Sequence, residues 1–347
     1  MQIKILCLEE KRLDAVSYWR VYMPLMVMRK LFPGVFEIEY KKTNLQFDDI
    51  ANSDIIIMTR PEDEQLLDFV KNAKADGIGL RFILDLDDDV LDIPACHSLS
   101  ALFDHKRKKI IKRAMDMADV LWTSTPRLAE KYGGICIPNA IIPEMLPNSP
   151  APDRNRLMWR GHSIQNHDLE LAGRQQFERL KKQVDYWAWI GYQPLFKGWE
   201  KSIPLPETDE LRKNVYSAKK ILGETPVVVY PNVRHTSAYL RMIRQEQFNY
   251  VWKPLYEHGF NEAKSNIALI EATIGGGVCI TNFAGRPMWE NATPEWINYD
   301  KSVQLWEKAK KQISTEFNLL EMARRRAKSI FQVLGYNTNP AENDTTH

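Results

Sequence analysis

The chain has 347 residues, of which 44% are hydrophobic and 27% are charged. This composition is typical of soluble globular proteins and excludes collagen-like, disulfide-rich and largely disordered chains. A formal net charge of +2 is too balanced to indicate a nucleic-acid or membrane protein by charge alone. Because a typical domain has about 150 residues, the length predicts two domains.

The chain contains no stretch near the ~20 apolar residues that a membrane-spanning helix needs. Its start, MQIKILCLEEK, turns acidic after six mostly apolar residues and does not resemble a signal peptide. The sequence therefore predicts a cytoplasmic protein without a transmembrane segment.

The first half of the chain alternates short apolar runs with longer segments of helical spacing. The runs are uniformly apolar and four to six residues long, at 3–8, 35–40, 54–58, 81–85, 120–123 and 134–137. Such runs are typical of buried parallel strands. Between them, residues 17–31, 62–75 and 103–118 have the length and spacing of helices. The repeated strand-helix-strand order predicts a doubly wound α/β sheet.

A second unit begins near residue 150, where four prolines lie between Pro143 and Pro152 and indicate a linker. Residues 1–150 carry 20 basic and 23 acidic side chains, whereas residues 151–347 carry 27 and 22. Strands are expected at 156–159, 186–191, 226–230, 250–252 and 278–281, with a helical pattern from 300 to 334. We therefore expect an N-terminal domain over 1–148, a second domain over 149–312, and a C-terminal helix with its tail over 313–347.

The most informative segment starts at Phe260 and ends in the strand at 278–281. Asn261 or Ser265 can cap a helix whose free N–H groups face a phosphate, and Lys264 adds a positive charge. Glu271 lies about two turns further along. An ordinary capped helix with a glycine at its C-terminal end has the same spacing, so the pattern alone leaves both interpretations open.

The run FNEAKSNIALIEATIGGGVCIT resembles the donor-site segment of GT-B glycosyltransferases, in particular the nucleotide-sugar-dependent group 1 enzymes and their phage and bacterial relatives. Further segments recur in that group's order: YWRVYMPL, DLDDDVLDIP, ADVLWTSTPRLAEKYG followed by IPN, WRGHSIQNHDLE and WAWIG. Together these segments cover most of residues 15–285. The resemblance implies two Rossmann-like domains that face a cleft, with a C-terminal helix crossing back.

The same resemblance implies a hexosyl- or pentosyltransferase that uses a UDP- or GDP-linked sugar as donor and needs no obligatory metal or other cofactor. It assigns the donor diphosphate to Lys264 and Ser265 and the ribose hydroxyls to Glu271, with Asn261 in the same segment. The turn after the first strand of the second domain would face the leaving phosphate, and it supplies Arg160, Gly161, His162 and His167.

Two departures from the family pattern motivate a rival hypothesis. The common pair of glutamates is absent, because Ala263 stands eight positions before Glu271. The usual Gly-Arg and Lys-Gly pair is also replaced, with His162 after Gly161 and Asp168 where a lysine is expected. A catalytically silent protein that only binds nucleotide sugars is the alternative.

An acidic turn, containing Asp85, Asp87, Asp88 and Asp89, follows a predicted strand of the first half. Clustered carboxylates can hold Mg²⁺ or act in a metal-dependent phosphatase through Asp85 and Asp87. The resemblance instead assigns this turn to the acceptor side, without a metal. An inverting enzyme needs a base there, for which Asp87, Asp88 and His97 are candidates, whereas in a retaining enzyme the leaving phosphate can take the acceptor proton.

Basic residues supply the remaining candidates for the acceptor side. Arg20 follows the first strand and Arg60 ends the third, and open α/β sheets bind ligands at the carboxyl ends of their strands. Two basic runs, residues 105–113 and 324–328, are typical of solvated helix faces. The first run follows the acidic turn, so a polyanionic acceptor such as DNA with hydroxymethylated bases is one hypothesis, and a surface glycan or lipid-linked sugar is the other.

Overall fold

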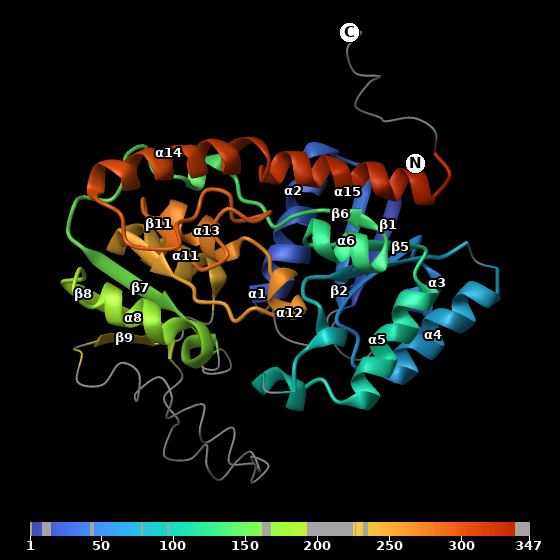
Figure 1. Cartoon of the computed structure of the whole chain (residues 1–347). Helices are drawn as coiled ribbons and strands as arrows, with labels where there is room; N and C mark the ends of the chain where they lie inside the picture. The colour runs from blue at the N-terminus through green and yellow to red at the C-terminus, as the bar shows by residue number, and fades with distance from the viewer. Residues whose placement is uncertain are drawn as a thin grey trace, which may run out of the picture.

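The computed structural model describes residues 2–8, 15–41, 45–77, 79–95, 97–161, 168–192, 225, 227–231 and 235–336. In this part of the chain, two parallel sheets of six and five strands form two α/β domains side by side (Figure 1). This confirms the predicted architecture.

The first sheet has the strand order β2-β1-β3-β4-β5-β6. Its strands are β1 Ile3–Leu8, β2 Phe36–Lys41, β3 Ile55–Thr59, β4 Arg81–Leu86, β5 Val120–Thr123 and β6 Ile135–Cys136. Ile5 lies between Ile38 of β2 and Ile55 of β3, so this strand is buried on both edges. Most of the apolar runs predicted from the sequence are buried strands of this sheet. The expected burial is wrong for the edge strand β2, in which Glu37 and Glu39 are exposed.

The second sheet has the order β11-β10-β7-β8-β9. Its strands are β7 Arg156–Arg160, β8 Tyr186–Tyr192, β9 Val227–Pro231, β10 Tyr250–Trp252 and β11 Val278–Ile280. The direction of winding reverses between β7 and β10 in this sheet and between β1 and β3 in the first. Ligands of open α/β sheets bind outside the carboxyl ends of the strands at such reversals.

Helices cover both faces of each sheet. In the first domain they are α1 Ala15–Ser17, α2 Met23–Leu31, α3 Phe47–Ala51, α4 Glu64–Ala75, α5 His105–Met117 and α6 Pro126–Tyr132. In the second they are α8 Arg174–Leu180, α11 Thr236–Glu246, α12 Gly259–Glu262 and α13 Ile267–Ile274. Two π-helical turns, Tyr18–Tyr22 and Leu169–Gly173, each precede the first long helix of a domain.

The alternation of side chains along a strand divides the core of the first domain into two layers. Ile5 and Cys7 belong to the layer under α2, whereas Leu6 and Leu8 belong to the layer under α3, α4 and α5. The layer that contains Ile5 continues into the second domain, where it includes Met158 of β7. One apolar core therefore runs through both domains.

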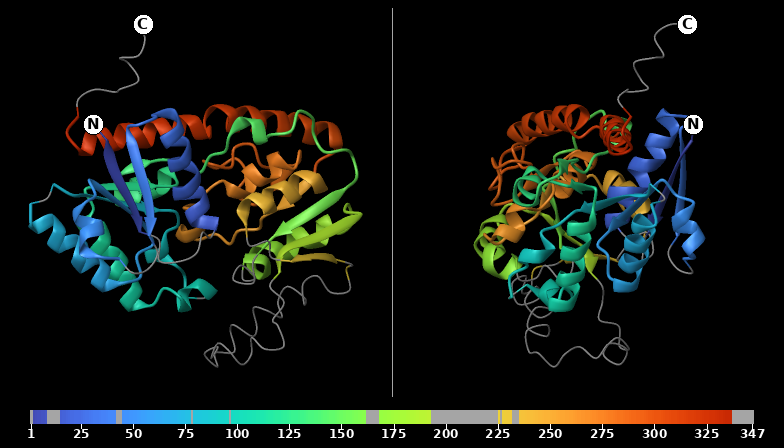
Figure 2. Two further views of the ribbon diagram at one scale, coloured as in Figure 1. Left: turned by 180° about the vertical axis from the view of Figure 1, so that it is seen from behind. Right: turned by 90° about the vertical axis from the view of Figure 1, so that its right-hand side faces the viewer.

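Two C-terminal helices run along one side of both domains (Figures 1 and 2). The first, α14 Tyr299–Thr315, packs on α13 and β11 of the second domain, and the next, α15 Leu319–Val333, packs on α2 of the first. The chain thus crosses back, as the resemblance implied. The single predicted helical stretch is broken at residue 316, and Asn318 caps the new helix by accepting a hydrogen bond from the backbone N–H of Leu320 (2.9 Å).

The two places where the chain passes between the domains lie next to each other. Ile141, which precedes the proline-rich segment, donates its N–H to Phe317 O (3.1 Å) and accepts from Leu319 N (3.0 Å). Ala151, further along the proline-rich segment, lies against Gly276 of the second domain, where a Cβ would lie 2.5 Å from the backbone nitrogen of Ala151. Glycine also permits its φ of +79°, so the linker packs tightly on the second domain.

Candidate functional site

The carboxyl ends of the two sheets meet at the boundary between the domains. Thr125, after β5, donates its hydroxyl to Ala263 O (3.3 Å), and Lys264 Nζ lies 3.0 Å from Asp88 Oδ1 after β4. The imidazole of His97 packs edge-on against the Phe260 ring, with 5.0 Å between centroids. We call residues 87–95, 97 and 124–127 of the first domain, together with residues 258–266 of the second, the interdomain junction.

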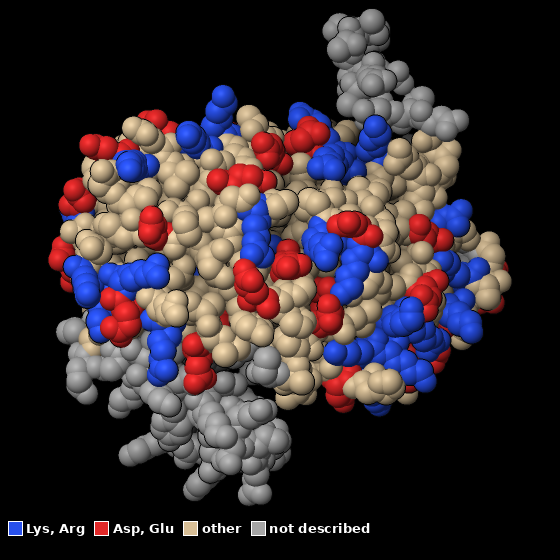
Figure 3. Space-filling model, viewed as in Figure 1, with Lys and Arg blue, Asp and Glu red and all other residues tan. Residues whose placement is uncertain are grey.

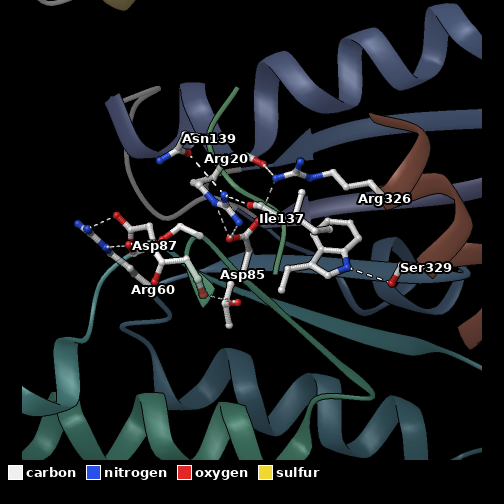
Figure 4. A network of polar contacts seen from close by, with 12 residues as sticks. Arg20, Arg60, Asp85, Asp87, Ile137, Asn139, Arg326 and Ser329 are labelled. Carbon is white, nitrogen blue, oxygen red and sulfur yellow. Dashed lines mark hydrogen bonds and ion pairs between the residues drawn. The ribbon is translucent and has the colours of Figure 1, made fainter. Parts of the chain in front are cut away.

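The first aspartate of the acidic turn is buried inside the first domain. Asp85 accepts a hydrogen bond from Arg20 Nε (2.8 Å), and its other carboxylate oxygen lies 3.5 Å from Arg326 of α15 (Figure 4). All three side chains are at most 1% exposed. Arg20 also donates to Ile137 O (2.6 Å), so the structure places Arg20 in a buried network that ties α15 to the first sheet.

This network corrects one expectation about the second basic run. Arg326 was expected on a solvated helix face, but it is 1% exposed and lies over the Trp122 ring, 5.2 Å from its centroid. Arg324, two positions earlier, keeps the expected exposure and pairs with Glu321 across one helical turn. Burial together with the charge of Arg20 lowers the pKa of Arg326 to about 9.

The next two aspartates face the junction. Arg60, at the end of β3, donates through Nε to Asp87 Oδ1 (2.7 Å), and its Nη2 contacts both Asp87 and Asp88. Burial raises the pKa of Asp87 in spite of Arg60. Burial opposes ionisation of Asp88 too, but Lys264 and Arg60 outweigh it and lower the pKa of Asp88. Arg60 has a φ of +44°, a strained backbone conformation for a side chain of this size.

The last aspartate and the histidine complete the first-domain side. Asp89 is 1% exposed and pairs with Lys131 Nζ at 2.7 Å and with the hydroxyl of Tyr132. His97 is also 1% exposed, and its Nδ1 accepts a hydrogen bond from Leu99 N (3.1 Å). Asp85, Asp89 and the pair of Asp87 and Asp88 therefore each contact a different set of cations, with Arg60 shared by Asp87 and Asp88. Within the described ranges, no group of three or more His, Cys, Asp and Glu side chains could hold a metal ion.

On the second-domain side, the end of β7 carries a buried ion pair. Arg160 Nε lies 2.8 Å from Glu271 Oε2 of α13, and Glu271 is 1% exposed. Burial disfavours the charge on Arg160, but Glu271 and Tyr239 of α11 outweigh it and raise the pKa of Arg160. Burial raises the pKa of Glu271 against the effect of Arg160. Sequence reasoning named Arg160 and Glu271 separately and missed both their pairing and Tyr239.

The turn after β7 requires glycine at position 161. A Cβ there would lie 2.3 Å from two ring atoms of Trp159, and the Gly161 carbonyl accepts a hydrogen bond from Trp189 Nε1 (2.8 Å). Two further predicted residues of this turn, His162 and His167, lie outside the described residues. Asp168 comes next, is 2% exposed and accepts hydrogen bonds from Tyr256 N (3.0 Å) and Asn261 Nδ2 (2.7 Å).

The end of β10 supplies a lysine that sequence reasoning did not single out. Lys253 is 5% exposed, and burial together with the charges of Arg160 and Lys264 lowers its pKa to about 7 against the opposing effect of Asp168. The sequence could have indicated this residue, because Lys253 directly follows the predicted strand at 250–252, as Arg60 follows β3.

The start of α13 combines the predicted Lys264 and Ser265 with a second unforeseen residue. Asn266 precedes the helix, is 0% exposed, and neither its amide oxygen nor its amide nitrogen has a hydrogen-bond partner among the described residues. The same holds for the amide oxygen of Asn261 and for Asp168 Oδ2. Buried polar atoms are normally hydrogen-bonded, so a polar ligand is the natural partner for these groups.

No helix in the described part of the chain combines the length and the apolar character required to cross a membrane.

Comparison with known proteins shows the fold. No family model and no curated protein matches the chain. Among solved structures, trehalose-6-phosphate synthase with bisubstrate glycomimetics has a TM-score of 0.56 at 10% identity and covers 94% of this chain and 99% of its own. A trehalose-6-phosphate structure from E. coli bound with UDP-2-fluoro glucose has 0.53 at 10%, covering 95% and 99%. A UDP-N-acetylglucosamine 2-epimerase from Listeria monocytogenes has 0.50 at 12%, covering 98% and 99%. The chain has the GT-B fold.

Proposed function

We propose that the chain is a glycosyltransferase, which moves a sugar from a UDP- or GDP-linked donor to a hydroxyl acceptor at the interdomain junction. One observation carries the proposal: Arg160, Lys264 and the start of α13 lie at the winding reversal of the second sheet, opposite the acidic turn of the first sheet, which contains Asp87 and Asp88. Cations and helix N–H groups suit a diphosphate, and a carboxylate opposite them suits an acceptor hydroxyl.

On the donor side, Lys264, Ser265 and the free N–H groups of α13 bind the diphosphate. The resemblance assigns the ribose to Glu271, yet this carboxylate lies 2.8 Å from Arg160 and is 1% exposed. We therefore infer that Glu271 acts through Arg160, which it holds at the end of β7. Electrostatic stabilisation of the leaving diphosphate is then the main contribution of this domain to the reaction.

On the acceptor side, Asp87 is the best suited of the three proposed bases. Its raised pKa brings it nearer to neutral pH, where a general base is most effective. Asp88 holds Lys264 instead, and His97 is buried with Nδ1 accepting a backbone N–H. This assignment applies to an inverting enzyme, because in a retaining enzyme the leaving phosphate can take the proton.

The acceptor that the surface favours is a polyanion, for which DNA with hydroxymethylated bases is our proposal. Lys and Arg gather on the face of the molecule over α5 (Figure 3), and α5 packs on the turn Val90–Asp92 that follows the acidic turn. Lys106 and Lys109 are exposed there and, with the half-buried Lys108, have no ion pair among the described residues. Arg107 and Arg113, by contrast, pair with acidic side chains of or next to α4.

Donor chemistry is tested first, with UDP- and GDP-sugars and with UDP and GDP alone. We expect one nucleotide diphosphate to bind by calorimetry and its sugar donor to be hydrolysed slowly without acceptor. Lys264→Ala should weaken that binding by about ten- to a hundredfold, because a charged hydrogen bond contributes roughly 1.5–3 kcal/mol, whereas Lys308→Ala on the exposed face of α14 should not. Absence of nucleotide binding would refute the proposal, and binding without any donor turnover would favour the catalytically silent alternative.

The acceptor is tested by the salt dependence of duplex DNA binding. The logarithm of the DNA association constant falls linearly with the logarithm of the salt concentration, and each phosphate-binding cation contributes about 0.9 to the steepness of that fall. Replacing Lys106, Lys108 and Lys109 together by alanine should therefore reduce the steepness by about 3. Sugar transfer to hydroxymethylated duplex should fall in the same variant. A flat salt response would favour a glycan or lipid-linked acceptor.

A further inference from the structure

Both strands at the winding reversal of the second sheet end in a cation. Arg160 is the last residue of β7, and Lys253 directly follows β10, where its backbone N–H donates to Ile280 O (2.8 Å) and extends the sheet by one pairing. The strands β7 and β10 are neighbours, and Trp252 of β10 pairs with Trp159 of β7. Lys253 and Arg160, the next residues along the two strands, therefore lie at the same level of the sheet.

Three cations and two carboxylates of the second domain act on one another in the described part of this site. Arg160, Lys253 and Lys264 face two buried carboxylates, Glu271 and Asp168. Glu271 lies 2.8 Å from Arg160, and Lys264 finds its carboxylate, Asp88, only in the opposite domain. Lys264 is thus neutralised from across the boundary, and Arg160 and Lys253 lie together at the position where an open sheet binds its ligand.

Neutral side chains of the segment that contains Lys264 lack hydrogen-bond partners among the described residues. Asn266 is fully buried and leaves both amide atoms without a hydrogen bond among the described residues, as does the amide oxygen of Asn261. Both residues belong to the segment that contains Lys264. An anionic ligand with several oxygens can accept from Arg160, Lys253 and the amide nitrogen of Asn266 together.

Resting on the proposed function, we propose that Lys253 is the second phosphate-binding cation of the donor site and that it takes up a proton when the donor diphosphate binds. It takes the place of the lysine that the family pattern expects at position 168, which is an aspartate here. Burial and two neighbouring cations disfavour the ammonium form of Lys253, and a bound diphosphate reverses that balance.

Among the described residues, the charged and titratable groups that act on Lys253 are Arg160 of β7, Asp168 before η6 (Leu169–Gly173), Lys264 before α13, Glu271 of α13 and Cys279 of β11. Tyr239 of α11 lies next to Glu271 and Arg160. Burial raises the pKa values of Cys279 and Tyr239 well above neutrality. Lys253, with a pKa of about 7, is therefore the group in this set that changes charge near pH 8.

The test is calorimetric titration with UDP and GDP at pH 8, in two buffers of different ionisation enthalpy. At this pH the terminal phosphate of the nucleotide is already ionised, and a lysine with a pKa of about 7 is about nine-tenths neutral. We expect the wild-type protein to take up about 0.9 proton for each nucleotide bound. Lys253→Met should abolish the uptake and weaken binding at least tenfold.

Two further variants separate this inference from the proposed function. Lys253→Arg keeps a permanent charge, so it should bind more tightly than Lys253→Met but without proton uptake. Lys264→Met should weaken binding and keep proton uptake, in reduced amount, because loss of the Lys264 charge raises the pKa of Lys253. Nucleotide binding without proton uptake in the wild type, or unchanged uptake in Lys253→Met, would overturn the inference and leave the proposed function standing. Failure of the wild type to bind either nucleotide would overturn both.

Discussion

Asp85 is the single carboxylate shared by two buried guanidinium groups, and its replacement tests how α15 is held to the first domain. Arg20 contacts Asp85 Oδ1 through Nε at 2.8 Å and Nη2 at 2.7 Å, and Arg326 lies 3.5 Å from the other oxygen. Asp85→Asn keeps the shape of the side chain but leaves two positive charges, each 1% exposed, without a counter-ion. Breaking a buried ion pair from one side costs about 3–5 kcal/mol.

Urea unfolding followed by tryptophan fluorescence measures this loss, because Trp122 donates its indole N–H to Ser329 of α15 (3.1 Å) within the same network. The midpoint should fall while the dependence on urea concentration stays the same. Glu178→Gln is the matched control, since it breaks an exposed pair with Lys181 and should change stability by less than about 1 kcal/mol.

A double variant shows that the loss comes from uncompensated charge. Adding Arg326→Met to Asp85→Asn removes one of the two unpaired cations, so the double variant should be more stable than Asp85→Asn alone. If the unfolding free energy of Asp85→Asn differed from that of the wild type by no more than the exposed control, the buried network would not be holding α15 in place.

Three further predictions concern the site. The folded-state pKa of Lys253, about 7, lies below the ordinary value of about 10.4, so between these pH values the folded protein binds fewer protons than the unfolded protein. The unfolding free energy of the wild type, measured by urea unfolding, should therefore rise relative to that of Lys253→Met by up to about 1.4 kcal/mol per pH unit between pH 7 and 9. A difference that stays constant with pH would contradict the burial of a titrating amine. Gly161→Ala should displace the Trp159 ring, cost about 1–3 kcal/mol by overpacking and weaken UDP binding, whereas wild-type affinity and stability would show that the turn tolerates a side chain. Asp88→Asn frees Lys264 from its ion pair and should raise UDP affinity by up to about fivefold; weaker binding in calorimetry would show that Asp88 helps to hold the donor.

The strands were predictable because their signal is local. A run such as residues 120–123 or 250–252 is apolar on both faces, and burial between helices on both sides of a parallel sheet requires that pattern. The sequence also indicated that α4 begins near residue 62, and Asp63 caps it by accepting a hydrogen bond from Gln65 N (2.9 Å). These features depend on neighbours along the chain.

The partners of charged residues were not predictable in the same way. Arg326 stands in the run Arg324-Arg325-Arg326, and only the position of α15 over the first sheet decides that this one arginine is buried beside Asp85. Glu271 and Arg160 are 111 positions apart in the sequence, and their 2.8 Å contact arises from the packing of α13 on the second sheet. Such contacts are tertiary, and no periodicity in the sequence encodes them.

The paired chain crossings beside Ile141 and Phe317 limit how the two domains can move. Because the crossings are hydrogen-bonded to each other and lie on the side covered by α14 and α15 (Figure 2), a rigid-body rotation leaves both unstrained only if its axis passes close to them. Rotation about that hinge separates the two halves of the interdomain junction, whose contacts include the Lys264–Asp88 ion pair of 3.0 Å and the buried Thr125–Ala263 hydrogen bond of 3.3 Å. Opening would also expose part of the apolar core that runs through both domains, so a ligand that contacts both halves of the junction stabilises the closed arrangement further.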